Sequence, residues 1–249
     1  MLLEQYMDLS TSTIEDIEVI AVLYVIWLTL YLLARHIFFR SLSPDGANRV
    51  VSLLHAFIGI VLPAGAINFA ALQADVGTPT TRAQLLALRV SLSYFLYDTF
   101  CCIAIELSTT GLDVATTFHH VATLSGLLVG VFQRVSGHEL LCCLLLMEVS
   151  NPCMHTRFLL KETGMADTQL YAVNGAVFAF TFLMCRNVLG LPVVYWTVMS
   201  ERTPLIVKAG GLGIMFVSLF WTKKLLSMIR RAFGSPEKGG KPGKLGKAA

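Results

Sequence analysis

Charged residues are scarce in this sequence. Lys, Arg, Asp and Glu make up 14% of its 249 residues, whereas apolar residues make up 55% and the mean hydropathy is +0.68. A soluble domain carries roughly 25% charged residues, which solvate its surface. The shortage excludes an ordinary cytosolic enzyme, a disordered regulator and a nucleic-acid-binding protein, so we expect no nucleic-acid partner.

Other patterns are absent as well. The six cysteines lie inside or at the edges of apolar runs and form no Cys-x-x-Cys pair, so we expect neither a disulfide framework nor a metal site. The lack of an internal repeat disfavours a transporter. A retinal-binding receptor would need a lysine in the middle of its last span, but Lys208 lies at the start of that segment and Lys223 near its end.

Long apolar runs, by contrast, fill almost the whole chain. About 20 apolar residues cross the ~30 Å hydrocarbon core of a bilayer as a helix. We therefore predict an all-α polytopic membrane protein with seven transmembrane helices. The expected spans are residues 17–39, 50–72, 84–105, 115–133, 138–160, 170–195 and 205–229.

The placement of Lys and Arg predicts the orientation in the membrane. With seven spans, thirteen of these residues fall on one side and five on the other, and the richer side is normally cytosolic. This puts the C terminus in the cytosol and the N terminus outside it. The chain then divides into an acidic non-cytosolic segment (1–16), a first transmembrane helix with its loop (17–49), a six-helix domain (50–230) and a basic, disordered cytosolic tail (231–249).

Ionisable residues occur inside the third and fourth spans. Asp98 shares a helical face with Tyr94, and a carboxylate in hydrocarbon must be paired or face a wet cavity. His119 and His120 point about 100° apart on their helix, and imidazole is the natural proton carrier near neutral pH. Each of these groups could instead be a helix–helix strut or an interfacial side chain.

The fifth span carries a polar stripe beside a proline. Glu148, Asn151 and His155 are spaced so that they share one helical face, and Pro152 is expected to kink the helix there. Arg157 follows near the cytosolic end of the span.

The sixth span adds Asn174 and Arg186. An arginine stays charged, so Arg186 needs a carboxylate or a lipid phosphate, and Glu148 is the expected partner. At 1.5 Å per residue, Asp98, the two adjacent histidines and His155 fall in the cytosolic half of the membrane. This convergence predicts an intramembrane chamber that opens towards the cytosolic leaflet.

The order of these residues resembles the TLC domain family, which includes ceramide synthases and small proteins of lipid homeostasis. The resemblance covers about residues 50–230. It is carried by Tyr94-x-x-Tyr97-Asp98, His119-His120, Glu148-x-Ser150-x-Pro152, Arg157, Asn174 and Arg186. It implies a TLC-type bundle of six helices around a membrane chamber, with one extra helix at the N terminus.

In ceramide synthases the paired histidines are catalytic, which by resemblance assigns that role to His119 and His120. An acidic pair in the next helix assists them in that branch. Here the stretch MEVSN (147–151) stands in its place, so glutamate replaces one acid and the other is lost. The long basic acceptor loop is missing too, which makes the chain more similar to the small members that are not ceramide synthases.

Two hypotheses about function follow from these residues. In the first, the protein is a His-dependent acyltransferase that acts on a membrane lipid, with acyl-CoA as co-substrate and no bound cofactor. Its expected catalytic residues are His119, His120, Asp98 and Glu148. Its expected substrate-binding residues are Tyr94, Asn151, His155, Arg157, Asn174 and Arg186.

In the second hypothesis, the same chamber binds or senses lipid without chemistry and so regulates membrane composition. Both hypotheses place the protein in the endoplasmic reticulum or another endomembrane. Its expected partners are membrane lipids. The sequence is also compatible with assembly into a homo-oligomer.

Overall fold

The computed structural model describes residues 2–109 and 111–233, and their side chains between residues 12 and 230. Within these ranges the chain forms helices and no β-strand, apart from an isolated bridge between Pro79 and Val135. The predicted all-α class is therefore confirmed. The expected lysine-rich tail lies outside the described residues from residue 234 onward. The helices are α1 (Leu2–Leu33), η1 (Ala34–Phe38), α2 (Pro44–Ala66), η2 (Phe69–Ala71), α3 (Arg82–Ser108), α4 (Val114–Leu128), η3 (Val129–Gln133), α5 (Gly137–Glu148), α6 (Asn151–Glu162), α7 (Gln169–Leu183), η4 (Met184–Leu189), α8 (Gly190–Met199) and α9 (Leu205–Phe233).

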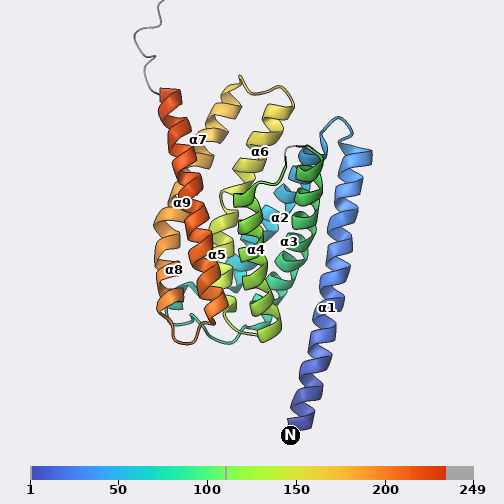
Figure 1. The fold of residues 1–249 in the computed structure, drawn as a ribbon, viewed down its shortest axis with the longest axis vertical. Helices are drawn as coiled ribbons and strands as arrows, with labels where there is room; N and C mark the ends of the chain where they lie inside the picture. The colour runs from blue at the N-terminus through green and yellow to red at the C-terminus, as the bar shows by residue number, and fades with distance from the viewer. Residues whose placement is uncertain (1, 110, 234–249) are drawn as a thin grey trace, which may run out of the picture.

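Six helical segments in the described ranges are long and apolar enough to cross a membrane. They are Ser12–Phe38, Pro44–Ala66, Arg82–Ser108, Val114–Gln133, Gln169–Met199 and Leu205–Arg230. The remaining expected span, 138–160, which is the fifth along the chain, consists of α5 and α6, which follow each other across the bundle (Figure 1). The described residues thus form a membrane protein with seven helical crossings.

The fifth crossing is broken rather than kinked. Helix α5 ends at Glu148, and α6 begins at Asn151 with Pro152 in its first turn. Proline is favoured there, because the first N–H groups of a helix have no intrahelical acceptor. The expected kink at this proline is therefore corrected to the start of a new helix.

Short sequence signals set several helix ends. Ser43 caps α2 ahead of a proline, and Thr81 forms a capping box with Gln84 at the start of α3. The Asp113 carboxylate accepts from two backbone N–H groups at the start of α4. These caps place the starts of α2, α3 and α4 within a few residues of the edges of the apolar runs.

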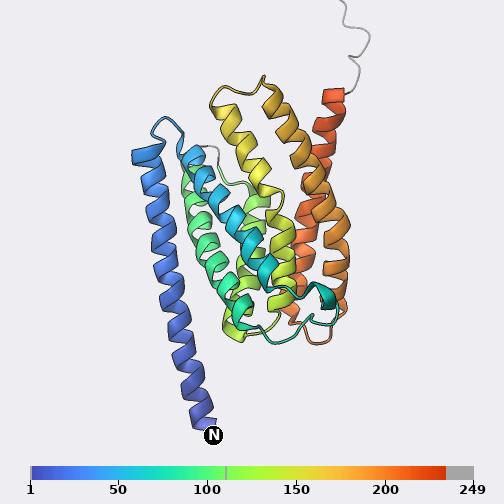
Figure 2. The same cartoon turned by 180° about the vertical axis from the view of Figure 1, so that it is seen from behind.

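Helix α1 lies at the edge of the molecule and packs against α3, as Figures 1 and 2 show from opposite sides. Two polar contacts connect it to the bundle. The buried Asp16 carboxylate pairs with Arg89 of α3 and with Arg134, whose Nη2 lies 2.7 Å from Asp16 Oδ2. Further along α1, Trp27 Nε1 donates to Ser93 Oγ at 3.2 Å.

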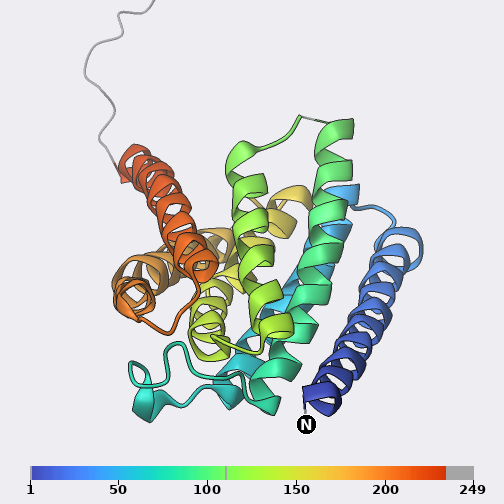
Figure 3. The ribbon, with the colours of Figure 1, turned by 60° about the horizontal axis from the view of Figure 1, so that its bottom comes forward.

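The other helices pack around a closed ring, seen obliquely from one end in Figure 3. Its order is α2, α3, α4, α9, α8 with α7, and α6, which returns to α2, while α5 packs against α2, α3 and α8. Large apolar side chains such as Phe57, Phe180 and Phe216 are exposed on the outside, where lipid tails would contact them. The start of α1 and the end of α9 lie at opposite ends of the bundle (Figure 1), as an odd number of crossings requires.

Candidate functional site

The ring of helices encloses a cavity of about 810 Å³, which we call the chamber. One end of the chamber is polar: its wall includes Asp45 and Arg49 of α2, Glu106 of α3 and Asp113 before α4. This polar end lies beside the α1–α2 and α3–α4 loops, at the end of the bundle where α9 finishes (Figure 1).

The opposite half of the chamber is mainly apolar. Its wall is formed by Leu140 and Leu144 of α5, Val194 of α8, and Val207 and Ile214 of α9. A chamber with a polar mouth and an apolar interior is chemically complementary to a lipid. The free-energy cost of removing the polar headgroup from water is lowest beside polar side chains, and acyl chains gain most from contact with apolar side chains.

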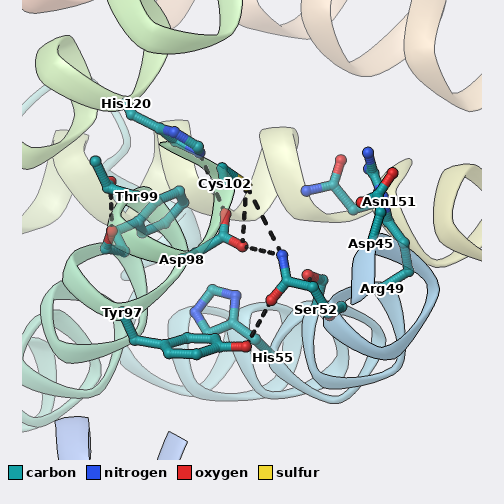
Figure 4. A network of polar contacts seen from close by, with 12 residues as sticks. Asp45, Arg49, Ser52, His55, Tyr97, Asp98, Thr99, Cys102, His120 and Asn151 are labelled. Carbon is teal, nitrogen blue, oxygen red and sulfur yellow. Dashed lines mark hydrogen bonds and ion pairs between the residues drawn. The ribbon is translucent and has the colours of Figure 1, made fainter. Parts of the chain in front are cut away.

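Asp98 and His120 form a buried pair on the chamber wall. His120 Nε2 lies 3.2 Å from Asp98 Oδ2, and both residues are more than 90% buried. The pair joins α3 to α4 across 22 residues of sequence, and Figure 4 shows the imidazole directed at the carboxylate. With Nε2–H donating to the acid, the lone pair of the imidazole is on Nδ1.

Helix α2 supports the other oxygen of Asp98. Asn48 Nδ2 donates to Asp98 Oδ1 at 2.8 Å, and the Tyr97 hydroxyl donates to Asn48 Oδ1 at 2.5 Å (Figure 4). The Cys102 thiol also approaches Asp98 Oδ1, at 3.6 Å. These contacts hold the carboxylate in one orientation, so they also fix the direction in which His120 points.

The carboxylate of Glu148 lies beside the imidazole of His55. The carboxylate accepts from Asn151 Nδ2 at 3.0 Å and lies 3.8 Å from His55 Nδ1. The His55 ring stacks on Tyr94 with ring centroids 3.6 Å apart. Tyr94, Glu148 and Asn151 all line the chamber, as does the buried His155.

His119 occupies the side of α4 that faces α9. Its ring lies 5.4 Å from the Trp221 ring and 5.8 Å from the His120 ring, and its Nε2 finds no hydrogen-bond partner among the described residues. Both histidines line the chamber, although their rings point in different directions, as adjacent helical positions must.

Arg186 and Glu148 interact electrostatically, as expected, but they form no ion pair within 4.0 Å. Arg186 Nη2 donates to the Met147 carbonyl oxygen at 3.3 Å, and Asn151 Oδ1 lies 3.5 Å away. The close contacts of the Glu148 carboxylate are instead with Asn151 and His55.

Two expected substrate-binding residues lie away from the chamber. Arg157 packs over the Tyr171 ring, 4.0 Å from its centroid, and Asn174 Nδ2 donates to the Cys153 carbonyl oxygen at 2.8 Å. Both contacts join α6 to α7. The geometry therefore gathers eight of the ten expected residues around one cavity, while the roles of all ten stay predictions.

Sequence reasoning missed three residues of this site. Asn48 falls in the loop that the sequence predicts before residue 50, although the Ser43-Pro44 cap signals a helix that already includes it. His55 gave no signal beyond its place in an apolar run. Trp221 could not be distinguished from a lipid-facing aromatic residue.

In the described ranges, no three His, Cys, Asp or Glu side chains gather closely enough to hold a metal ion. The chamber wall thus carries the Asp98–His120 pair, further imidazoles, the Glu148 carboxylate and the Arg186 guanidinium. Such a fold and site define a polytopic helical membrane protein with a cavity inside its helical bundle.

Comparison with known proteins identifies the family. The TLC domain family model matches residues 45–229. A TLC domain-containing protein of Arabidopsis thaliana is 30% identical over 180 residues, which cover 68% of each chain. TLC domain-containing protein 4 A of Dictyostelium discoideum is 26% identical over 147 residues, covering 58% of this chain and 56% of that protein. The chain therefore belongs to the TLC domain family, and the resemblance inferred from its motifs is confirmed.

Proposed function

We propose that the chamber holds a membrane lipid and that the protein transfers an acyl group to it with His120 as general base. The observation that carries this proposal is the 3.2 Å contact between His120 Nε2 and Asp98 inside the chamber. An imidazole base that is oriented by a carboxylate is the arrangement that activates hydroxyl and amine nucleophiles.

The reaction would proceed at the imidazole. His120 Nδ1 accepts a proton from a lipid hydroxyl or amine as that oxygen or nitrogen attacks the carbonyl carbon of an acyl thioester. The new C–O or C–N bond forms, the C–S bond breaks, and the leaving thiolate takes the proton from the imidazolium. Asp98 stabilises the charged imidazole in between, and acyl-CoA is the proposed thioester.

The chamber supports this assignment in a second way. The apolar half provides room for acyl chains, while the polar mouth lies at the end of the bundle where the soluble part of a thioester would enter. Because Arg35, Arg40 and Lys161 lie at or near this end, we propose that it is the cytosolic one, as in an endomembrane such as the endoplasmic reticulum.

Purified protein tests the chemistry directly. His120→Ala removes the proposed base and should reduce acyl transfer by ~10²–10⁴-fold. Asp98→Asn removes the acid that orients the base and should reduce acyl transfer by a smaller factor. His36→Ala is the matched control, because His36 is exposed in η1 and outside the chamber. Acyl transfer that survives His120→Ala at the wild-type rate contradicts the assignment.

The second candidate is a lipid-binding regulator without chemistry. It is favoured by one observation: Glu148, which stands where ceramide synthases have part of their acidic pair, contacts Asn151 and His55 rather than His119 or His120. Untargeted lipidomics separates the two candidates. Cells that carry the His119→Ala/His120→Ala double variant should match the null cells if the protein is an enzyme, and the wild type if it only binds lipid.

A further inference from the structure

Arg186 is a buried cation whose N–H donors are only partly used. Its side chain lies in η4 and the residue is 6% exposed, with one hydrogen bond from Nη2 to the Met147 carbonyl and a distant contact to Asn151. Arg186 Nε and Nη1 find no acceptor among the described residues. A guanidinium keeps its charge and has five N–H donors, so this environment satisfies only part of it.

Aromatic rings flank the guanidinium of Arg186 but provide no oxygen acceptors for its N–H groups. Arg186 Cζ lies 4.8 Å from the centroid of the Phe182 ring and 5.7 Å from that of Trp221. The face of an aromatic ring attracts a cation. The N–H groups in the plane of the guanidinium still need oxygen acceptors.

Two further polar groups near Arg186 lack partners. His119 Nε2 and Thr123 Oγ1 are buried without a hydrogen-bond partner in the described residues, and they lie one turn apart on α4. The His119 ring packs against Trp221, which also flanks Arg186. All these side chains line the chamber, so their unused donors lie on the wall of the same cavity.

An arginine with a purely structural role would be satisfied by the protein itself. Arg89 and Arg134 come closer to this expectation, since both form close ion pairs with Asp16 and are partly exposed, although Arg134 Nη1 also finds no acceptor in the described part of the chain. Arg186 has no carboxylate within 4.0 Å among the described residues, so the charge of Glu148 acts on it only from farther away. Arg186 also borders a cavity that can admit a ligand. Its missing acceptors are therefore expected from the ligand.

We propose that Arg186 binds a phosphate group of the molecule in the chamber, with His119 and Thr123 as additional donors. Phosphate offers several oxygens to the planar fork of a guanidinium and neutralises its charge. The inference rests on the proposed function, because that function places a lipid and an acyl thioester in the chamber. The phosphate belongs either to a phospholipid headgroup or to the coenzyme A part of the thioester.

Two matched pairs of probes test the proposal by equilibrium binding to the purified full-length protein in detergent. The first pair is palmitoyl-oleoyl phosphatidylcholine and the corresponding diacylglycerol. The second is palmitoyl-CoA and palmitoyl N-acetylcysteamine thioester, which has no phosphate. The proteins compared are wild type, Arg186→Gln, Arg186→Lys and the control Arg202→Gln, whose arginine is exposed outside the chamber and donates to the Ala74 carbonyl oxygen.

We expect the wild type to bind the phosphate-bearing member of one pair about tenfold more tightly or better, and that pair identifies the source of the phosphate. Arg186→Gln should lose this preference without weaker binding of the phosphate-free probe. Arg186→Lys should keep part of it, since lysine retains the charge but not the fork. The control Arg202→Gln should keep the whole preference for the phosphate-bearing probe.

Equal binding within both pairs by the wild type overturns the proposal, and so does a preference that survives Arg186→Gln. If Arg186→Gln does not fold, the proposal is still tested by the preference of the wild type for a phosphate-bearing probe and by the reduced preference expected of Arg186→Lys. Acyl transfer is measured on the same preparations. Transfer without phosphate preference overturns only this proposal, whereas phosphate preference without transfer overturns only the acyltransferase function.

Discussion

Two places in this bundle bury arginine in opposite ways. Where α1 meets the bundle, Arg89 and Arg134 share the carboxylate of Asp16, which is 1% exposed. In the chamber, Arg186 is more deeply buried and donates mainly to a backbone carbonyl. The first two arginines thus have a carboxylate in direct contact and partial access to water, whereas Arg186 has neither within the described ranges.

The difference distinguishes a structural role from a binding role. A charge inside a membrane protein is costly unless it is paired, hydrogen-bonded or solvated. The Asp16 cluster meets this requirement by close ion pairs and partial exposure of its arginines, and it thereby fastens α1 to α3 and to Arg134. Arg186 meets it only in part, which leaves its remaining donors for a ligand.

Asp16→Asn should have the largest effect on stability. It leaves Arg89 and Arg134 without their counter-charge, and removing one partner from a buried ion pair costs about 3 kcal/mol, the lower end of the range because both arginines are partly exposed. Thermal unfolding in detergent measures the loss. Glu15→Gln is the matched control, because Glu15 is exposed on the same turn of α1. Equal melting temperatures for the two variants would show that the cluster does not fasten α1.

Glu139→Leu should have an intermediate effect. The buried Glu139 carboxylate accepts from the Gly77 N–H at 3.1 Å and from the Thr203 hydroxyl at 3.1 Å, so it connects α5 to the α2–α3 and α8–α9 loops. Leucine preserves volume but leaves the buried Gly77 N–H without an acceptor, which costs about 2 kcal/mol. The same unfolding assay applies, with the exposed Glu201→Gln as control. A loss no greater than that of the control would mean that these loops are held by other contacts.

Arg186→Gln should have the smallest effect on stability, and it should raise the free energy of unfolding rather than lower it. Replacing an incompletely satisfied buried charge by a neutral residue is often stabilising, here by about 1 kcal/mol in the ligand-free protein. Unfolding in detergent without added lipid measures the change. A loss as large as that of Asp16→Asn would make Arg186 a structural residue and remove the contrast between the two arginine sets.

Much of the fold could be predicted because lipid imposes simple rules on sequence. Runs of about 20 apolar residues must become helices to satisfy their backbone groups, so the crossings could be located from composition. The fifth crossing was the exception in detail. A proline in an apolar run can kink a helix or begin a new one, and only the packing of α5 and α6 decides between them.

The members of the site could be predicted better than their contacts. Asp98, His119, His120, Glu148 and Arg186 drew attention because ionisable groups are rare at membrane depth, and all of them line the chamber. Their partners could not be read from spacing. The Asp98–Asn48 bond joins residues 50 positions apart, and the carboxylate of Glu148 makes its close contacts with Asn151 and His55 rather than with Arg186.

The sequence by itself determined that this protein crosses a membrane and which side chains would be costly there, because hydropathy and charge are properties of single residues. Only the tertiary structure decided which of those side chains satisfy one another and which remain open to a ligand. Pairing depends on distances of a few ångströms between helices, and those distances arise from how the whole ring of helices packs.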